Sequence, residues 1–244
     1  QMSKKLESLT AGMRIPYGGN NLAIVSEELA SEFESGDRLI VIQTTGDLLH
    51  VPADVWKIST KTVQRAHDAF LEMGSVDDHA ITKFFKLFAD YLLDERRFSA
   101  IKDSNDEDVR VAKSKGRSTT RLVLSEKMRE DMVAGLRLWE NTPSQRGSAI
   151  EEISHDGWKV KLITAGLGVI GFIFEGRPNV FADATGVLRS GNTVVFRIGS
   201  DALLTANAIV KHALDPALKE SGLPIGSVSL INSAERSAGY AMFS

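Results

Sequence analysis

Apolar and polar positions in the last third of the chain alternate in blocks that predict a strand, a helix and a second strand. Residues 167–174 form a short apolar run with β-branched members, which is typical of a strand buried on both faces. A polar turn over 175–179 interrupts this run, and we expect residues 180–189 to be helical. Residues 190–192 end the helix, and 193–197 form the second strand. The pattern therefore predicts a βαβ unit.

The alternation continues to the end of the chain. A helix is expected over 201–220 with a bend at Pro216, because proline removes a backbone donor. A third strand follows over 228–231, and a further helix over 234–242. Strands that alternate with helices predict an open parallel sheet with right-handed crossovers. We expect the strand over 167–174 to lie at the centre of this sheet.

The first half of the chain is predicted to be mainly helical, after a hairpin. Its apolar residues recur at helical spacing, most clearly over 79–93, and Ser125 is placed to cap the helix that follows it. The predicted elements are helices over 20–33, 60–73, 79–93, 105–115 and 126–139, a hairpin of 37–43 with 48–51, and extended segments at 153 and 158–164. The fold class that follows is α/β, with a helical first half that leads into a parallel βαβ sheet.

The polar turn after the first strand of the βαβ unit carries the most suggestive chemistry. In open α/β sheets ligands bind at the carboxyl ends of the strands, and this turn lies at such an end. Pro178 suits the first turn of a helix, so Asn179 sits where the strand gives way to the helix. A side-chain amide there could donate a hydrogen bond to an oxyanion. The alternative is that Asn179 only caps the helix or forms the turn.

A second turn, after the strand over 193–197, offers features that suit a nucleotide. Arg197 ends the strand, and Gly199, Ser200 and Asp201 lead into the next helix. Backbone N–H groups at a helix start suit a ribose or a phosphate. The alternative is that Ser200 is simply the N-cap of that helix. The glycine-rich G-x-G-x-x-G pattern of common dinucleotide sites does not occur in the sequence.

Composition narrows the functional classes. A net charge of −3 over 244 residues gives no reason to expect a nucleic acid or a membrane surface as partner. The sequence has no cysteine, so it contains no disulfide, no thiolate metal site and no cysteine nucleophile. This agrees with a reducing compartment, and we expect a cytoplasmic protein. The five histidines are scattered without the spacing of metal ligands, so no metal site is expected.

Three motifs in this order resemble the aldehyde dehydrogenase superfamily, and within it the glutamate-5-semialdehyde dehydrogenase (γ-glutamyl phosphate reductase) branch. They are GVIGFIFEGRPNV at 168–180, LRSGNTVVFR at 188–197 and GLPIGSVSLI at 222–231. The Glu-Gly-Arg-Pro-Asn-Val run is similar to the reductase branch, whereas the general superfamily has Pro-Trp-Asn in place of Arg-Pro-Asn. The resemblance is strong over 160–235, weaker over 60–140 and not visible over 1–35.

The resemblance implies a Rossmann-like NADP-binding domain that lacks the glycine fingerprint. It implies that Asn179 is the oxyanion-hole amide and that 157–164 is the strand used for oligomerisation, which favours a homo-oligomer. Its implied cofactor-binding residues are Gly176, Arg177 and Pro178 beside the nicotinamide, Arg197, Gly199, Ser200 and Asp201 near the adenosine ribose, and Gly239 near the pyrophosphate. Where the branch has Gly-Gly-Ser/Lys-Glu, this chain has Ile198-Gly199-Ser200-Asp201, so the NADP or NAD preference stays open.

The family's cysteine nucleophile belongs to a catalytic domain that this sequence does not contain. We therefore expect the chain to be an amino-terminal portion, with an extension and hairpin over 1–59 and an incomplete NADP-binding domain over 60–244. The expected reaction is NADPH-dependent reduction of γ-glutamyl phosphate to glutamate 5-semialdehyde, of the proline biosynthesis type, with the chain alone inactive. Two alternatives remain open. The first is another aldehyde dehydrogenase-type acyl reductase or dehydrogenase, which would act on an acyl phosphate or an aldehyde. The second is a non-catalytic nucleotide-binding module.

Overall fold

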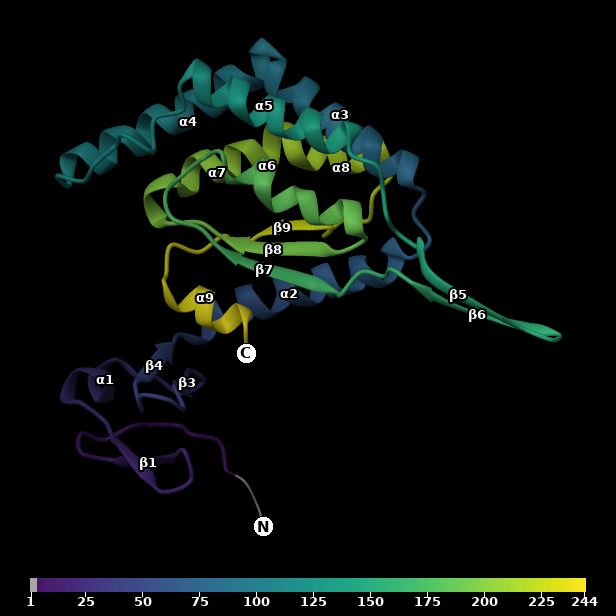
Figure 1. Ribbon diagram of the computed structural model, residues 1–244. Coiled ribbons are helices and arrows are strands. Elements are labelled where there is room, and N and C mark those ends of the chain that lie inside the picture. Colours follow the sequence, from purple (N-terminus) through teal and green to yellow (C-terminus); the bar gives the residue numbers. More distant parts are fainter. Residues whose placement is uncertain (1–3) are drawn as a thin grey trace. The chain divides into compact units, whose positions relative to one another are not determined.

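A computed structural model describes residues 4–244, and the chain divides into two compact units (Figure 1). One unit runs to Lys61 and includes Glu235–Ser244, and the other comprises Thr62–Ala234. The boundary between them falls within helix α2, Ala53–Met73. Residues 235–244, which the sequence interpretation assigns to the larger domain, are thus grouped with the first unit. The assignment of the domains to NADP binding stays a prediction.

The larger unit is built on a parallel three-stranded sheet in the order β7-β8-β9. The strands are Val169–Ile173, Thr193–Arg197 and Val228–Leu230, with Gly171 opposite Val195 and Val195 opposite Ser229. The expected parallel βαβ arrangement is confirmed, but the prediction that the 167–174 strand is central is wrong. Strand β8 is central and buried at every position, whereas β7 lies at an edge and is only half-buried. The apolar run misleads because some of its apolar residues are exposed: Leu167 is 89% and Ile173 52% exposed.

The crossover after β7 begins as α6 (Val180–Thr185) and tightens into a 3₁₀ turn, η1 (Gly186–Ser190), which Gly191 ends with a φ of 79°. The helix after β8 is similarly uneven. It consists of a 3₁₀ turn η2 (Ser200–Ala202), α7 (Leu203–Ile209), a π turn η3 (Val210–Leu214) and α8 (Asp215–Ser221).

The irregularity predicted at Pro216 therefore lies one turn earlier, in the π turn. Pro216 sits in the first turn of α8. A proline there needs no backbone donor, so the disturbed hydrogen bonds fall on the residues before it. Gly222 ends the helix in the left-handed conformation, with a φ of 81°.

Helices cover both faces of the sheet. In Figure 1, α3 (Asp78–Leu93), α4 (Glu95–Ser114) and α5 (Glu126–Asn141) form an outer layer over α6, α7 and α8. The part of α2 that belongs to the larger unit lies on the opposite face of the sheet, where Thr193 donates to the carbonyl of Ala66 at 2.8 Å. Ser125 caps α5 by accepting from Met128 N at 3.2 Å, which confirms the predicted cap.

A single apolar core connects the outer helices with the sheet. Phe88 of α3 packs edge-on against Phe181 of α6, with ring centroids 6.3 Å apart. Phe181 in turn packs edge-on against Phe196 of β8 at 5.1 Å. All three rings are fully buried. This contact chain fixes α6, and with it the turn that precedes α6, on the central strand.

A buried polar cluster joins α4 to α7. Asn105 donates to the carbonyl of Leu122 and accepts from Leu124 N, both at 2.8 Å. Asp108 accepts from Thr205 N at 2.8 Å and from the Thr205 hydroxyl at 2.7 Å. Burial raises the pKa of Asp108 above its ordinary value, although the hydrogen bonds from Thr205 oppose that rise. The cluster fixes the connection between α4 and α5 beside the start of α7.

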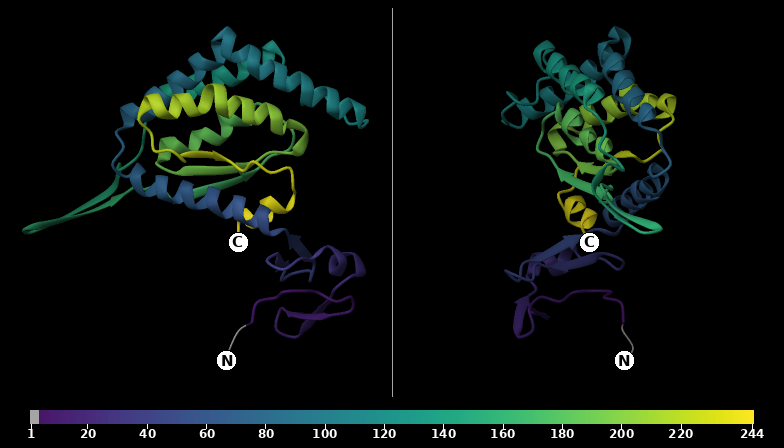
Figure 2. Two further views of the ribbon diagram at one scale, coloured as in Figure 1. Left: turned by 180° about the vertical axis from the view of Figure 1, so that it is seen from behind. Right: turned by 45° about the vertical axis from the view of Figure 1, so that its right-hand side comes forward.

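Strands β5 (Ala149–His155) and β6 (Trp158–Ile163) form a hairpin that projects from the larger unit (Figure 2). Every residue of both strands is exposed. The extended segments predicted around 153 and 158–164 are therefore confirmed, and they pair with each other. The pairing places Ile153 opposite Val160 and His155 opposite Trp158.

The described part of the smaller unit holds two hairpins, two short helices and the first part of α2. Its elements are β1 (Arg14–Tyr17), β2 (Asn21–Ile24), α1 (Glu27–Glu32), β3 (Arg38–Val41), β4 (Leu48–Val51) and α9 (Ser237–Met242). The predicted 37–51 hairpin is confirmed, but the predicted helix over 20–33 is wrong in its first half. Residues 21–24 pair with β1, and the helix begins only after Ser26, whose hydroxyl accepts from Leu29 N.

The predicted helices over 60–73 and 105–115 begin earlier than expected, at Ala53 and Glu95. Asp94 provides the missed start of α4, because its carboxylate accepts from Arg97 N at 2.9 Å. Among residues 4–244, no helix combines the length and the hydropathy needed to cross a bilayer.

Candidate functional site at the carboxyl edge of the sheet

Two turns meet where β7 and β8 end. Phe174 N donates to the carbonyl of Arg197 at 2.8 Å, which extends the pairing of the two strands to their last residues. Beyond this bond the backbones approach closely, because a Cβ on Gly199 would lie 3.1 Å from Gly176 N. A Cβ on Gly176 would lie 3.8 Å from the Cβ of Asp201. The structure therefore brings together Gly176, Gly199 and Asp201, three of the residues that the sequence singles out.

Asn179 occupies the N-cap position of α6, but its side chain makes no capping hydrogen bond. Its backbone is already helical, with φ −78° and ψ −2°, whereas a capping side chain needs an extended backbone. The Oδ1 atom of Asn179 is buried and has no hydrogen-bond partner among the described residues. Buried polar atoms are nearly always paired, so this amide needs an explanation other than capping.

Arg197 is buried and bonded within the protein, and Ser200 does not cap the helix that follows it. The side chain of Arg197 is 8% exposed and donates from Nη2 to the carbonyl of Ala234 at 3.3 Å, in the loop after β9. Gly199, not Ser200, is the N-cap of the 3₁₀ turn, so the interpretation of Ser200 as a cap is wrong. Ser200 is the first residue of that turn and is exposed.

The remaining side chains of the turn before α6 differ in how far they are covered. Pro178 is buried, and Arg177 is exposed. Arg177 N donates to the carbonyl of Glu175 at 2.8 Å, which closes the turn before α6. Gly239 is a buried residue of α9 in the smaller unit, and its role near a pyrophosphate stays a prediction.

Two arginines that the sequence interpretation does not single out reach this edge from the connection between α4 and α5. Arg117 forms an ion pair with Asp201, and its Nη1 donates to Oδ1. Arg121 approaches Glu175 with a nitrogen–oxygen distance of 4.0 Å. No local pattern marks these arginines, because Arg117 and Asp201 are 84 residues apart in the chain. Each of the two neighbouring strand ends thus has one acidic residue beside one arginine.

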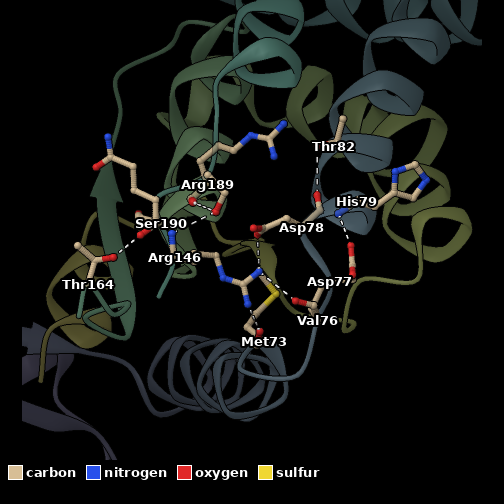
Figure 3. Close-up of polar contacts among 12 residues, drawn as sticks. Met73, Val76, Asp77, Asp78, His79, Thr82, Arg146, Thr164, Arg189 and Ser190 are labelled. Atoms are coloured by element: carbon tan, nitrogen blue, oxygen red, sulfur yellow. Dashed lines mark hydrogen bonds and ion pairs between the residues drawn. The ribbon is translucent and has the colours of Figure 1, made fainter. Parts of the chain in front are cut away.

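A second polar cluster lies away from this edge, around Arg146 (Figure 3). Arg146 donates to the carbonyls of Met73 at 2.8 Å and Val76 at 3.0 Å, and to the Asp78 carboxylate at 2.9 Å. The cluster borders a cavity of about 550 Å³ that also includes Thr164 and Gly166. Because the guanidinium is occupied by the end of α2 and the start of α3, we interpret this cluster as structural.

Arg189 has a similar structural role. It donates from Nε to the carbonyl of Trp139 at 2.7 Å and from Nη2 to the carbonyl of Glu140 at 2.8 Å. Burial lowers the pKa of Arg189 below its ordinary value. Within residues 4–244, no group of three or more histidine, aspartate or glutamate side chains is arranged to hold a metal ion.

Comparison with known proteins identifies the relatives of this chain, although no family model matches it. The γ-glutamyl phosphate reductase of Heliobacterium modesticaldum is 32% identical over 184 residues, which are 73% of this chain and 43% of the relative. The crystal structure of the Thermotoga maritima γ-glutamyl phosphate reductase superposes with a TM-score of 0.69 and 30% identity, over 75% of this chain and 45% of that one. The chain is a homologue of the γ-glutamyl phosphate reductases. It spans about two fifths of the length of the curated relatives it matches.

More distant structures share the fold alone. They include aldehyde dehydrogenases, and an engineered glycolyl-CoA reductase with bound NADP+ superposes with a TM-score of 0.53 at 17% identity. That match covers 75% of this chain and 39% of the other. The predicted α/β, aldehyde dehydrogenase-like fold class is thus confirmed.

Proposed function

We propose that this chain forms the cofactor-binding part of an NADPH-dependent acyl phosphate reductase that converts γ-glutamyl phosphate to glutamate 5-semialdehyde, a step of proline biosynthesis. The names of its relatives support this substrate class. The observation that carries the proposal within the structure is the Asn179 amide. It lies at a strand end, its Oδ1 is buried without a partner, and it does not cap its helix.

The residues at this edge fit a nicotinamide dinucleotide in three respects. Close backbone packing of Gly176 and Gly199 leaves two turns side by side. Asp201 offers a carboxylate at the start of the helix after β8, where dinucleotide folds recognise the ribose. The Oδ1 of Asn179 is buried without a hydrogen-bond partner, which marks this amide as a polar side chain that the described fold does not satisfy. We propose that Gly176, Arg177 and Pro178 line the nicotinamide side, and that Gly199, Ser200 and Asp201 face the adenosine ribose.

NADPH would supply the hydride, and the residues of this chain would bind, orient and stabilise. We propose that the Asn179 side-chain N–H donates to the carbonyl oxygen of the acyl group as that oxygen gains negative charge. The buried Pro178 and the packing of α6 against Phe196 hold the donor in place. The reaction also needs a thiolate nucleophile, and the chain has no cysteine. We therefore propose that the chain alone binds the cofactor without turnover.

We also propose that the protein is a cytoplasmic homo-oligomer whose subunits meet through the β5–β6 hairpin. One face of the hairpin carries Ile153, Trp158, Val160 and Leu162, which are 47–56% exposed. The other face carries Glu152, which pairs with Lys159 at 2.9 Å and Lys161 at 2.8 Å. An isolated two-stranded hairpin is at best marginally stable in water, so an apolar face of this kind favours burial against a second copy.

Two measurements test the proposed function. Titration of the chain with NADPH, followed by calorimetry, should show saturable binding that NADP+ competes for. The full-length product of the same gene should reduce NADP+ with glutamate 5-semialdehyde only when phosphate is present, because phosphate is the leaving group of the forward reaction. Absence of NADPH binding would refute the cofactor role, and phosphate-independent turnover would refute the acyl phosphate substrate.

A further inference from the structure

We infer that Arg117, held in place by Asp201, selects NADP(H) over NAD(H) by binding the 2′-phosphate of the adenosine ribose. The inference rests on the proposed function, since it concerns the same cofactor. It goes beyond it by naming a residue from the α4–α5 connection, outside the sheet, as the determinant of specificity.

The geometry places a guanidinium where the carboxylate would otherwise act alone. Asp201 is the second residue of the 3₁₀ turn after β8, next to the close contact between Gly176 and Gly199. Arg117 forms an ion pair with Asp201, and their side chains are 49% and 30% exposed. Both groups are therefore partly open to solvent.

The charges explain the selectivity. A carboxylate at this position accepts a hydrogen bond from the ribose 2′-hydroxyl of NAD(H) and repels the 2′-phosphate of NADP(H). The ion pair with Arg117 compensates the charge of Asp201 and adds donors. A guanidinium has five N–H groups in a planar fork, and the described structure uses one of them for Asp201. The remaining donors suit phosphate oxygens, which guanidinium binds in a bidentate manner.

The arginine is positioned before any ligand binds. Arg117 N donates to the carbonyl of Ala112 at 3.0 Å, which fastens it to the end of α4. Further along the same connection, Asn105 holds Leu122 and Leu124 through two buried hydrogen bonds. A binding residue that is already ordered loses little conformational entropy when its ligand arrives.

A second arginine strengthens the positive potential of this connection. Arg121 lies 4.0 Å from Glu175 at the neighbouring strand end and is 68% exposed. Because Arg121 approaches the other turn and only at this longer distance, we assign the 2′-phosphate to Arg117 alone.

The test compares dissociation constants of NADPH, NADH and 2′,5′-ADP, measured by calorimetry on the 244-residue chain. Arg117→Ala should weaken NADPH and 2′,5′-ADP about 10- to 100-fold, the range for a hydrogen-bonded charge, and leave NADH within about threefold. Arg117→Lys should retain part of the preference. Arg110→Ala is the matched control, because Arg110 is an exposed α4 arginine paired with Glu107.

The double variant Arg117→Ala/Asp201→Asn separates charge selection from a structural role. Removal of the uncompensated carboxylate should restore part of the NADPH affinity that Arg117→Ala loses. If wild-type chain binds NADPH but Arg117→Ala keeps its ratio of NADPH to NADH affinity, the inference is wrong and the proposed function stands. If wild-type chain binds none of the three probes, both are wrong. Thermal unfolding of each variant confirms that the compared proteins are folded.

Discussion

Replacement of Asn179 by alanine gives the most direct test of the site, because the structure predicts opposite signs for its effects on activity and on stability. In the complete enzyme, loss of one oxyanion donor should lower kcat by about 10²- to 10³-fold. The NADPH dissociation constant should change little, because the donor acts on charge that develops in the transition state.

The stability effect follows from the hydrogen bonds that Asn179 does not make. Removal of a capping side chain costs about 1 kcal/mol, but Asn179 makes no capping bond. Its Oδ1 is instead a buried acceptor without a partner, a state that costs about 1–3 kcal/mol. Alanine relieves that cost, although it also loses some packing. We therefore expect the free energy of unfolding to stay level or rise.

The assay pairs steady-state kinetics of the complete enzyme with thermal and urea unfolding of the same variant. For a chain of this size, loss of about 1 kcal/mol would lower Tm by about 2–4 °C. Asn179→Asp serves as a second variant, because a carboxylate of similar size would repel a developing oxyanion and should reduce kcat at least as much. A near-normal kcat together with a lowered Tm would show that Asn179 is a structural residue, and the oxyanion role would be refuted.

Three further predictions concern stability and assembly. Burial raises the pKa of Asp108 above its ordinary value of 3.8, so just above that pH the native state holds a proton that the unfolded state has lost. The free energy of unfolding should therefore fall as pH rises above this ordinary value; urea titrations at increasing pH should show the decrease for the wild-type chain, and Asp108→Asn should lack it. Gly226→Ala should lower the free energy of unfolding in urea by about 1–3 kcal/mol or more, since φ is +107° and the new Cβ would lie 2.6 Å from the Arg65 carbonyl oxygen. The control Gly222→Ala, with φ +81° and nothing within 4 Å, should lower it by only about 1 kcal/mol. Equal losses in the two variants would contradict the argument. Val160→Asp should reduce the mass of the oligomer in sedimentation velocity, and an unchanged mass would exclude the hairpin as the interface.

The sequence predicts the strands and most helices well because their signals are local. The strand over 193–197 matches β8, and Ser125 caps α5 as expected. The errors arise where tertiary packing overrides the local pattern. The apolar run at 167–174 indicates a central strand, yet packing leaves Ile173 exposed at the sheet edge. The helix predicted over 20–33 fails because Asn21–Ile24 pairs with a neighbouring strand.

From the sequence, only those site residues can be predicted that directly follow the strands of the sheet. Carboxyl ends of parallel strands share one edge, so the turns that contain Gly176 and Gly199 could be expected to lie together. The contribution of Arg117 could not, because it depends on how α4 packs against α7. That packing rests on Asp108 and Thr205, whose buried hydrogen bond joins residues 97 positions apart.

The way the two turns pack also bears on why the proposed selectivity for NADP(H) depends on a residue of the α4–α5 connection. At Gly199 the backbone of the adjacent turn is so near that a Cβ would lie 3.1 Å from Gly176 N and 3.4 Å from the carbonyl carbon of Glu175. Both neighbours are backbone atoms, which cannot move aside as a flexible side chain can. The turn after β8 therefore cannot carry a basic side chain at this position. The next position of the turn is Ser200, which carries no charge, so in this chain the positive charge beside Asp201 comes from Arg117 of the α4–α5 connection.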